Sequence, residues 1–302
     1  MTEGAPRSGL VVVDKPGGMT SHDVVARVRR LARTRKVGHA GTLDPMATGV
    51  LLLGVEKATR LLGHLALAEK QYDATVRLGI ATTTDDAEGD PTGGASAGNL
   101  TEAEVREALR RFTGPLQQVP STVSAVKVDG RRAYARARAG EEVRLRPRPV
   151  TVHELALLAV RAEGDVLDAD VRVRCSSGTY VRALARDVGA SLDVGGHLTA
   201  LRRTAIGVGA RSVTLADSLP LTELEQAAEL PMLGLADAAR RFFAVVEVDE
   251  RSERAVGFGR PLELEAPAPT GTPFGVLGPD GGLLALYAGQ QSGPATPVAV
   301  LV

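Results

Sequence analysis

The chain lacks several features that would assign it to well-defined classes of protein. It has one cysteine, Cys175, among 302 residues, which excludes an internal disulfide framework and any metal site built from several cysteines. No run of about eighteen apolar residues occurs, so we expect no transmembrane helix. The first residues, MTEGAPRSG, do not show the charged and then apolar pattern of a signal peptide. We therefore expect a cytoplasmic protein that does not associate with a membrane.

The chain also lacks net charge, because 36 Lys and Arg residues balance 36 Asp and Glu residues. This balance alone argues against a simple nucleic-acid-binding protein, but the basic residues are concentrated in two zones. Residues 27–36 contain six basic residues and no acid, and residues 127–148 contain eight basic residues and three acids. Two dense basic zones in a neutral protein favour a polyanion bound on one face. Solvated helical faces are the alternative, and the charge counts leave both interpretations open.

The hydrophobic pattern predicts an α+β fold. Strands are expected at 9–13, 50–54, 72–79, 121–128, 149–161 and 166–174, and helices from Thr20 or Ser21 to about Ala32 and at 102–112, 178–193 and 222–240. Thr101 and Glu104 are spaced as a capping box, Gly114 is expected to close that helix, and residues 81–99 read as a polar loop. After Phe242 the pattern changes to short strands broken by Gly and Pro. We therefore expect a large domain at 1–240 and a small β-rich domain at 243–302.

A turn-rich loop, VGHAGTLDPMATGV at residues 37–50, surrounds a single carboxylate, Asp44. Its glycines permit close approach of a ligand to the main chain, and Pro45 biases Asp44 to an extended conformation. The loop could be a pocket with one acid as its reactive group. It could equally be an ordinary turn that joins two elements, since Asp and Pro are common turn formers.

Motifs spread over residues 9–210 resemble those of the bacterial tRNA pseudouridine synthase B (TruB) family. In order along the chain they are GLVVVDKPGGMTSHDVVARVRR, KVGHAGTLDPMATGVLLLGVEKATR, KQYDATVRLG, TDDAEG, VPSTVSAVKVDGRRAYARARAG, VRCSSGTYVRALARDVG and HLTALRRTAIG. The resemblance implies a pseudouridine-synthase catalytic domain at 1–240, with a mixed, largely antiparallel central sheet and an RNA-binding insertion at about 121–150. It also implies that residues 243–302 form a small PUA-like domain.

The resemblance implies the isomerisation of uridine 55 to pseudouridine in the T-loop of tRNA, a reaction that needs no cofactor and no metal. Asp44 takes the position of the essential nucleophile of the family, and Arg182 that of the Arg that pairs with it. Tyr72 matches the active-site Tyr that stacks on the uracil. Without the motifs, Arg182 would be interpreted as a surface arginine and Tyr72 as a half-buried core residue.

Further residues are assigned by the resemblance to substrate or RNA binding. Leu201 matches a residue that packs on the base, His39 one that fills the space left by the flipped nucleotide, and Asp86 an acid near the pocket. The neighbouring Asp85 leaves the assignment of Asp86 open. The other expected RNA contacts are Lys15, Lys127, Arg131, Arg132 and Tyr134, the last four in an insertion expected to be loosely ordered before RNA binds.

The expected partner is therefore the T-arm of tRNA, and we expect a monomer with no obligate protein partner. A guide-RNA-dependent pseudouridylase subunit is the first alternative, but long tails and docking surfaces for partners are not evident. An RNA chaperone without catalysis would not need the Asp44, Tyr72 and Arg182 set, although an enzyme could also help tRNA to fold. A glycosidase would need a second carboxylate across the bond, and the loop offers one.

Overall fold

The structure is a computed structural model that describes residues 7–121, 127–128, 131–132 and 145–302, with only the backbone considered at 127–128 and 131–132. The chain forms two compact units. The first unit contains residues 1–68 and 205–302, and the second unit contains residues 69–204. The chain thus passes between the units after Ala68 and again within strand β12 (Gly196–Val208). The domain division at 240–243 stays a prediction.

The sheet of the first unit is mixed. Its central strand β1 (Gly9–Lys15) pairs antiparallel with β3 (Thr48–Val55) and parallel with β14 (Leu219–Pro220). Shorter strands add to it: β2 (Val37–His39) pairs with β3, β15 (Leu233–Gly234) pairs with β1, and β13 (Arg211–Thr214) pairs with the end of β12. Consecutive residues of β1 and β3 are buried, as expected for strands that are covered on both faces.

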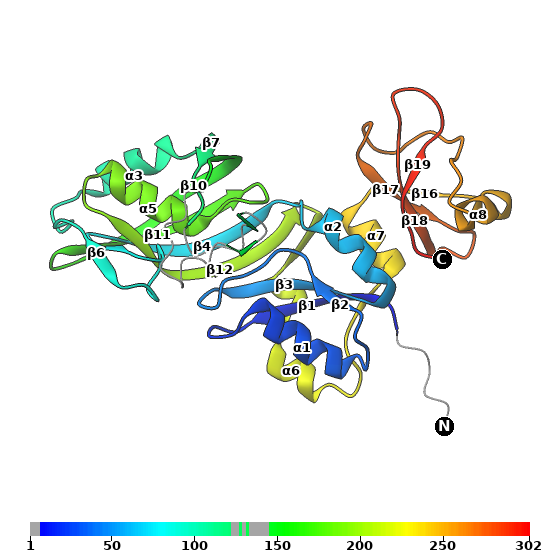
Figure 1. The fold of residues 1–302 in the computed structure, drawn as a ribbon, viewed down its shortest axis with the longest axis horizontal. Coiled ribbons are helices and arrows are strands. Elements are labelled where there is room, and N and C mark those ends of the chain that lie inside the picture. The colour runs from blue at the N-terminus through cyan, green and yellow to red at the C-terminus, as the bar shows by residue number, and fades with distance from the viewer. Residues whose placement is uncertain (1–6, 122–126, 129–130, 133–144) are drawn as a thin grey trace. The chain divides into compact units, whose positions relative to one another are not determined.

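Helices cover both faces of this sheet. Figure 1 shows α1 (Ser21–Leu31) and α6 (Leu221–Gln226) on one face, and α2 (Leu62–Leu65) and α7 (Leu235–Phe242) on the other. The 3-10 helices Glu56–Leu61 and Leu215–Asp217 connect neighbouring elements.

Helix α1 begins where the sequence predicted. The Thr20 side chain accepts a hydrogen bond from the Asp23 backbone, and the Asp23 side chain accepts one from the Thr20 backbone in return. This capping box satisfies donors at the helix start and is worth about 1 kcal/mol. Val24, Val25 and Val28 form the buried face of the helix, and its arginines lie on the remaining surface.

The C-terminal segment adds a separate four-stranded sheet to the first unit. Its order is β16 (Val245–Glu247), β17 (Pro273–Leu277), β18 (Leu283–Ala288) and β19 (Thr296–Val300). Helix α8 (Glu250–Gly257) contributes Val256 to a core with Phe274 and Tyr287. Leu286 lies on the other side of the sheet, in a cluster that also contains Leu10. The β-rich character expected for residues 243–302 is confirmed.

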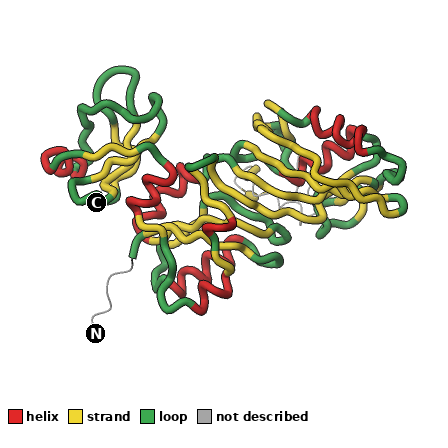
Figure 2. The backbone as a smooth tube through the Cα atoms, turned by 180° about the vertical axis from the view of Figure 1, so that it is seen from behind, coloured by secondary structure: helices red, strands yellow, loops and turns green. Residues whose placement is uncertain are grey.

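The strands of the second unit are paired in the order β12, β4 (Lys70–Leu78), β11 (Val166–Cys175), β10 (Arg148–Glu163) and β7 (Gly114–Gln118). The pairs from β4 to β7 are antiparallel. Helices α3 (Glu102–Arg111) and α5 (Val181–Ser191) lie together on one face, as the front view and the view from behind both show (Figures 1 and 2). Together with the mixed sheet of the first unit, this arrangement confirms the predicted α+β fold with a largely antiparallel sheet.

The other face of this sheet carries paired charges. Residues of β4 and β11 alternate between buried and partly exposed positions. The partly exposed positions form cross-strand ion pairs, among them Arg77 with Asp168, Arg172 with Asp73 and Arg161 with Asp170. Pairs with this exposure contribute about 0–1 kcal/mol each. Because the cations on this face are balanced by acids, it is a poor surface for a polyanion.

Two predictions of secondary structure need correction. The helix expected at 222–240 is two helices, α6 and α7, separated by β15, because Pro231 cannot donate the hydrogen bond of a continuous helix. Gly114 does not close α3, which ends at Arg111, but begins β7 with a φ of 103°. The end of the strand expected at 121–128 is found as β8 (Lys127–Val128), which pairs with β9 (Arg131–Arg132), and residues 122–126 lie outside the described residues.

The segment 81–99 is more structured than a polar loop. Strands β5 (Ala81–Thr82) and β6 (Pro91–Gly93) pair with each other. Ala97 is fully buried, and its backbone N–H donates to the carbonyl of Asp165 at 2.8 Å. The pairing of β5 with β6 and the contact of Ala97 with Asp165 thus order a stretch whose composition is typical of a loop.

Candidate active site

Asp44 lies in the loop between β2 and β3 of the first unit. The residues on either side of it are held by their backbones. Ser21, at the start of α1, donates through Oγ to the Leu43 carbonyl at 3.0 Å and accepts from the Leu43 N–H at 2.9 Å. The carbonyl of Pro45 accepts from the Gly18 N–H at 2.9 Å. The conformation of the loop at Asp44 is therefore fixed by hydrogen bonds to other parts of the chain, and not only by the turn preference of Asp and Pro.

Lys15 is the second anchor of this loop. Its side chain is 0 % exposed, and Nζ donates to the carbonyls of Pro16, Met19 and Pro45 at 2.9, 2.7 and 3.2 Å. A buried ammonium is costly unless it is hydrogen-bonded, and three carbonyls meet that need. Lys15 thus ties the end of β1 to the residue after Asp44. Its contact with RNA stays a prediction, whereas this structural role was not visible in the sequence.

Glycines and a histidine shape the rest of the loop. Gly41 and Gly49 have φ values of 88° and 99°, a region that favours glycine and that turns the chain at both ends of the loop. The half-buried His39 ring packs edge-to-face on His22, with ring centroids 5.4 Å apart. His39 therefore lies beside the start of α1, and its predicted place near a flipped nucleotide is untested.

Four of the predicted residues lie in the second unit: Tyr72, Asp86, Arg182 and Leu201. Tyr72 lies in β4 opposite Val173, and Leu201 lies in the neighbouring strand β12; both are buried. Tyr72 belongs to the face of β4 that alternation places in the interior. An aromatic ring and a leucine on adjacent strands are suited to packing against a flat ring.

Arg182 is buried in the first turn of α5 and binds the turn at residues 82–89. Its Nη1 donates to the Thr84 carbonyl at 2.9 Å and lies 3.3 Å from Asp86 Oδ2, with both side chains 4 % exposed. Asp86 in turn accepts from the hydroxyl of Thr84 and from the Glu88 N–H. Of the two acids, Asp86 thus contacts Arg182 and Asp85 contacts Arg186, and the assignment of Asp86 as the family's acid near the pocket stays a prediction.

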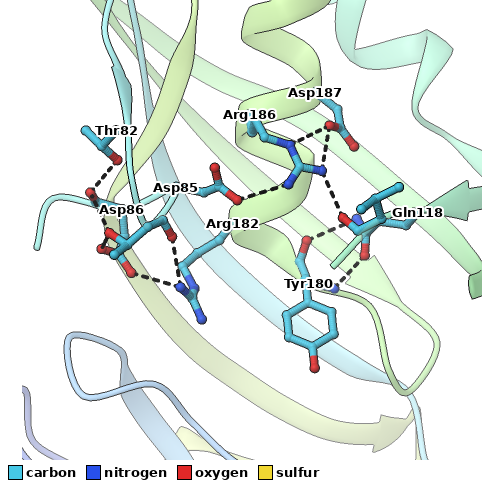
Figure 3. A network of polar contacts seen from close by, with 10 residues as sticks. Thr82, Asp85, Asp86, Gln118, Tyr180, Arg182, Arg186 and Asp187 are labelled. Atoms are coloured by element: carbon cyan, nitrogen blue, oxygen red, sulfur yellow. Dashed lines mark hydrogen bonds and ion pairs between the residues drawn. The ribbon is translucent and has the colours of Figure 1, made fainter. Parts of the chain in front are cut away.

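The same helix carries contacts that the sequence reasoning missed. Arg186 Nη1 lies 3.1 Å from Asp85 Oδ2, and Nε donates to Asp187 at 2.9 Å. Gln118, at the end of β7, forms a pair of hydrogen bonds with the backbone of Tyr180, which precedes α5. Figure 3 shows this network, with the Tyr180 ring directed away from it. The register of α5 on the turn produces these pairs, and no spacing in the sequence signals them.

Asp44 belongs to the first unit and Arg182 to the second, so the pairing of their side chains stays a prediction. Of the insertion, the backbones of Lys127, Arg131 and Arg132 lie in β8 and β9. Tyr134 and the loose order expected for this insertion lie outside the described residues.

Two further properties bear on the site. Within the described residues, no group of three or more His, Cys, Asp or Glu side chains is placed to hold a metal ion. Nor does the described part of the chain contain a helix long and apolar enough to span a membrane.

Comparison with known proteins gives a consistent result. Residues 29–181 match the profile of the TruB family pseudouridylate synthase (N terminal domain). A protein of Cutibacterium acnes named tRNA pseudouridine synthase B is 53% identical over 298 residues, which cover 98% of this chain and 99% of that protein. One of the same name from Thermobifida fusca is 54% identical over 296 residues, 97% of this chain and 98% of that protein.

A solved structure has a similar fold. The crystal structure of a Cbf5-Nop10-Gar1 complex contains a chain that superposes with a TM-score of 0.71 at 26% identity, over 97% of this chain and 83% of that chain. The C-terminal sheet is consistent with the PUA-like domain that the motifs implied. The profile match includes Asp44, Tyr72, Asp86 and the start of α5, and the relatives extend the similarity over nearly the full length. The chain therefore belongs to the TruB family of pseudouridylate synthases.

Proposed function

We propose that this enzyme isomerises uridine 55 in the T-loop of tRNA, with Asp44 as the essential carboxylate. Isomerisation of uridine to pseudouridine in tRNA is the activity of the family to which the chain belongs. The position in tRNA and the role of each residue are the proposed part. The observation that supports Asp44 most strongly is its place inside the matched segment 29–181, in a loop whose backbone Lys15 and Ser21 hold.

The reaction moves the glycosidic bond from one atom of the base to another. The bond from the ribose anomeric carbon to uracil N1 breaks, the base turns, and a bond to C5 forms. The proton on C5 is lost and N1 gains one, so atoms and electrons balance without a redox partner. Positive charge develops on the sugar as the first bond breaks, and a carboxylate beside it stabilises that charge or adds to it.

The reaction also suggests roles for the other candidate residues. Tyr72 would stack on the uracil from β4 and help to remove the C5 proton, and Leu201 would pack on the base from β12. Arg182, fixed on Asp86, would pair with Asp44. A carboxylate beside a guanidinium stays ionised even where water is largely excluded.

The uridine must leave its stack before it can react, at a cost of a few kcal/mol. Contacts with RNA phosphates would offset this cost and would weaken as salt rises. Lys127, Arg131 and Arg132 are proposed for these contacts. The paired-charge face of the second unit is not, because its arginines are already matched by acids.

We also propose that the enzyme acts as a monomer in the cytoplasm, without an obligate protein partner. The relatives from Cutibacterium acnes and Thermobifida fusca, which match nearly end to end, support a stand-alone enzyme. Assembly with other proteins, as in the complex whose fold is similar, is the alternative. A fully active preparation should elute from a size-exclusion column at the volume of a single chain.

The proposed position can be tested with tRNA transcripts that carry tritium at uracil C5. The enzyme should release one equivalent of tritium from a transcript with uridine 55. A transcript in which this uridine is replaced by cytidine should bind equally well and release none. Tritium release from the second transcript would contradict the assignment of position 55, and no release from either would contradict the activity itself.

A further inference from the structure

Two arginines of α5 hold two consecutive acids of one turn. Arg182 contacts Asp86 at 3.3 Å, and Arg186 contacts Asp85 at 3.1 Å. Residues four apart lie on the same side of a helix, so both guanidinium groups point toward the turn at 82–89 (Figure 3). The first pair belongs to the proposed active site. The second pair has no function in the mechanism described so far.

Asp85 holds an unusual backbone conformation. Its φ is 61°, in the left-handed region that is sterically costly for residues other than glycine, and its side chain is buried. Such a conformation persists only where the surroundings hold it. Asp85 lies between Thr84 and Asp86 in the chain, and the Thr84 carbonyl and the Asp86 carboxylate both contact Arg182. The backbone at Asp85 therefore determines where both acceptors point.

Arg186 is itself fixed from three sides. Beyond Asp85, its Nη2 donates to the Val119 carbonyl at 2.9 Å, and its Nε donates to Asp187 at 2.9 Å. Burial raises the pKa of Asp187, and the guanidinium opposes that rise. One side chain thus connects the turn, the helix and the segment that follows β7.

We propose that Arg186 is a positioning residue of the isomerisation: through Asp85 it holds the turn that orients the Arg182–Asp86 pair. The inference rests on the proposed function, in which Arg182 serves the reacting carboxylate. Arg186 itself is not proposed to touch the RNA or Asp44. Its removal should therefore slow the chemical step and leave the binding of tRNA unchanged.

A double-mutant cycle between Arg186 and Asp86 tests this directly. Single-turnover tritium release is measured for wild type, Arg186→Met, Asp86→Asn and the double variant, each at saturating tRNA. Arg186→Met should lower the rate about tenfold with less than a twofold change in tRNA affinity. In the Asp86→Asn background the same substitution should cost less than about threefold, because the pair that it positions is already broken. Equal losses in both backgrounds, or a wild-type rate for Arg186→Met, would overturn the proposal.

Controls separate positioning from general stability. Arg161→Met removes an Arg–Asp pair from the paired-charge face of the second unit and should leave the rate unchanged. Arg186→Lys can keep the contact with Asp85 and should recover part of the rate. If Arg186→Met does not fold, Asp85→Asn replaces it in the cycle, with the same loss expected and the same results counting against the proposal. Failure of the proposed function would instead appear as a lack of tritium release by wild type.

Discussion

The loop that carries Asp44 and the turn that carries Asp86 are held in different ways. Lys15 and Ser21 bind the backbone of the first loop at Leu43 and Pro45. In the turn at 82–89 the carboxylates are anchors in addition to the backbone, because Asp85 and Asp86 each contact an arginine of α5. A reacting acid is best placed by its backbone, since its side chain can then change charge or form a bond while the loop keeps its shape. The acids of the second turn, by contrast, cannot be changed without loss of an anchor.

The largest effect on stability is expected at Lys15. Lys15→Met removes the buried donor to three carbonyls, those of Pro16, Met19 and Pro45. The free energy of unfolding should fall by about 3 kcal/mol, because a hydrogen bond to a charged group contributes about 1.5–3 kcal/mol and three such bonds are lost. Urea unfolding measures the loss, and Lys36→Met, at an exposed lysine, is the matched control. A loss below about 1 kcal/mol would mean that the loop does not depend on this anchor.

Asp86→Asn tests the anchors of the second turn. The substitution removes the Asp86 charge that contacts the buried guanidinium of Arg182. We expect the free energy of unfolding to fall by about 3 kcal/mol, toward the lower end of losses measured for broken buried pairs. Asp170→Asn breaks a more exposed Arg–Asp pair of the same unit and should cost less than about 1 kcal/mol. Similar losses for the two variants would contradict the distinction drawn here.

Ser21→Ala weakens the first loop at its other anchor. The variant leaves the N–H and the carbonyl of Leu43 without the hydroxyl that now binds both. We expect a loss of about 1–3 kcal/mol in the free energy of unfolding, together with faster backbone amide exchange at Leu43. Unchanged exchange at this residue would show that other contacts hold the loop.

A smaller, pH-dependent effect is expected at Lys70, the buried lysine of the second unit. Burial, with Arg203 nearby, lowers the pKa of Lys70 to about 8 from 10.5. Between these values the unfolded chain binds more protons than the folded chain, so this group makes the fold more stable as pH rises above about 8. The free energy of unfolding of wild type should therefore rise by about 1 kcal/mol relative to that of Lys70→Met between pH 8 and 9. A constant difference over this range would contradict the lowered pKa.

The upper pH limit of that experiment is set by Cys175, which lies opposite Lys70 on the neighbouring strand. Burial raises the pKa of Cys175 to about 11 from 9.0, so its contribution falls as pH rises between those values. Measurements that stop at pH 9 and that compare two proteins with the same cysteine isolate the effect of the lysine.

Periodicity predicted the regular elements well where it was strong. The alternation in β4 and the helical repeat of α1, with its cap at Thr20, were read from single stretches of sequence, and the structure confirms them. The division of 222–240 into two helices was missed although Pro231 marks the break, whereas the pairing of Leu233 with β1 is a tertiary contact that the sequence does not signal. The ordering of 81–99 was missed because it depends on the pairing of β5 with β6 and on contacts with distant residues, such as Ala97 with Asp165.

The candidate site was predictable from motifs and not from spacing. The loop at Asp44 is an ordinary turn by composition, and only the family resemblance gave its acid a chemical role. Lys15 and Ser21 could not be identified as anchors, because their partners are backbone atoms up to thirty residues away. The different contacts of Asp85 and Asp86 with Arg186 and Arg182 could not be read from composition, because they depend on the fold of the turn, which includes one left-handed residue.

The central claim is that the Asp44 carboxylate carries the isomerisation. It is tested most directly by single-turnover tritium release from tRNA with wild type and with Asp44→Asn, both at saturating enzyme and with tRNA affinity measured on the same preparations. We predict that Asp44→Asn binds tRNA as wild type does and that its rate falls by a factor of about 10³ or more. A variant that binds tRNA and still releases tritium at a rate near that of wild type would contradict the account.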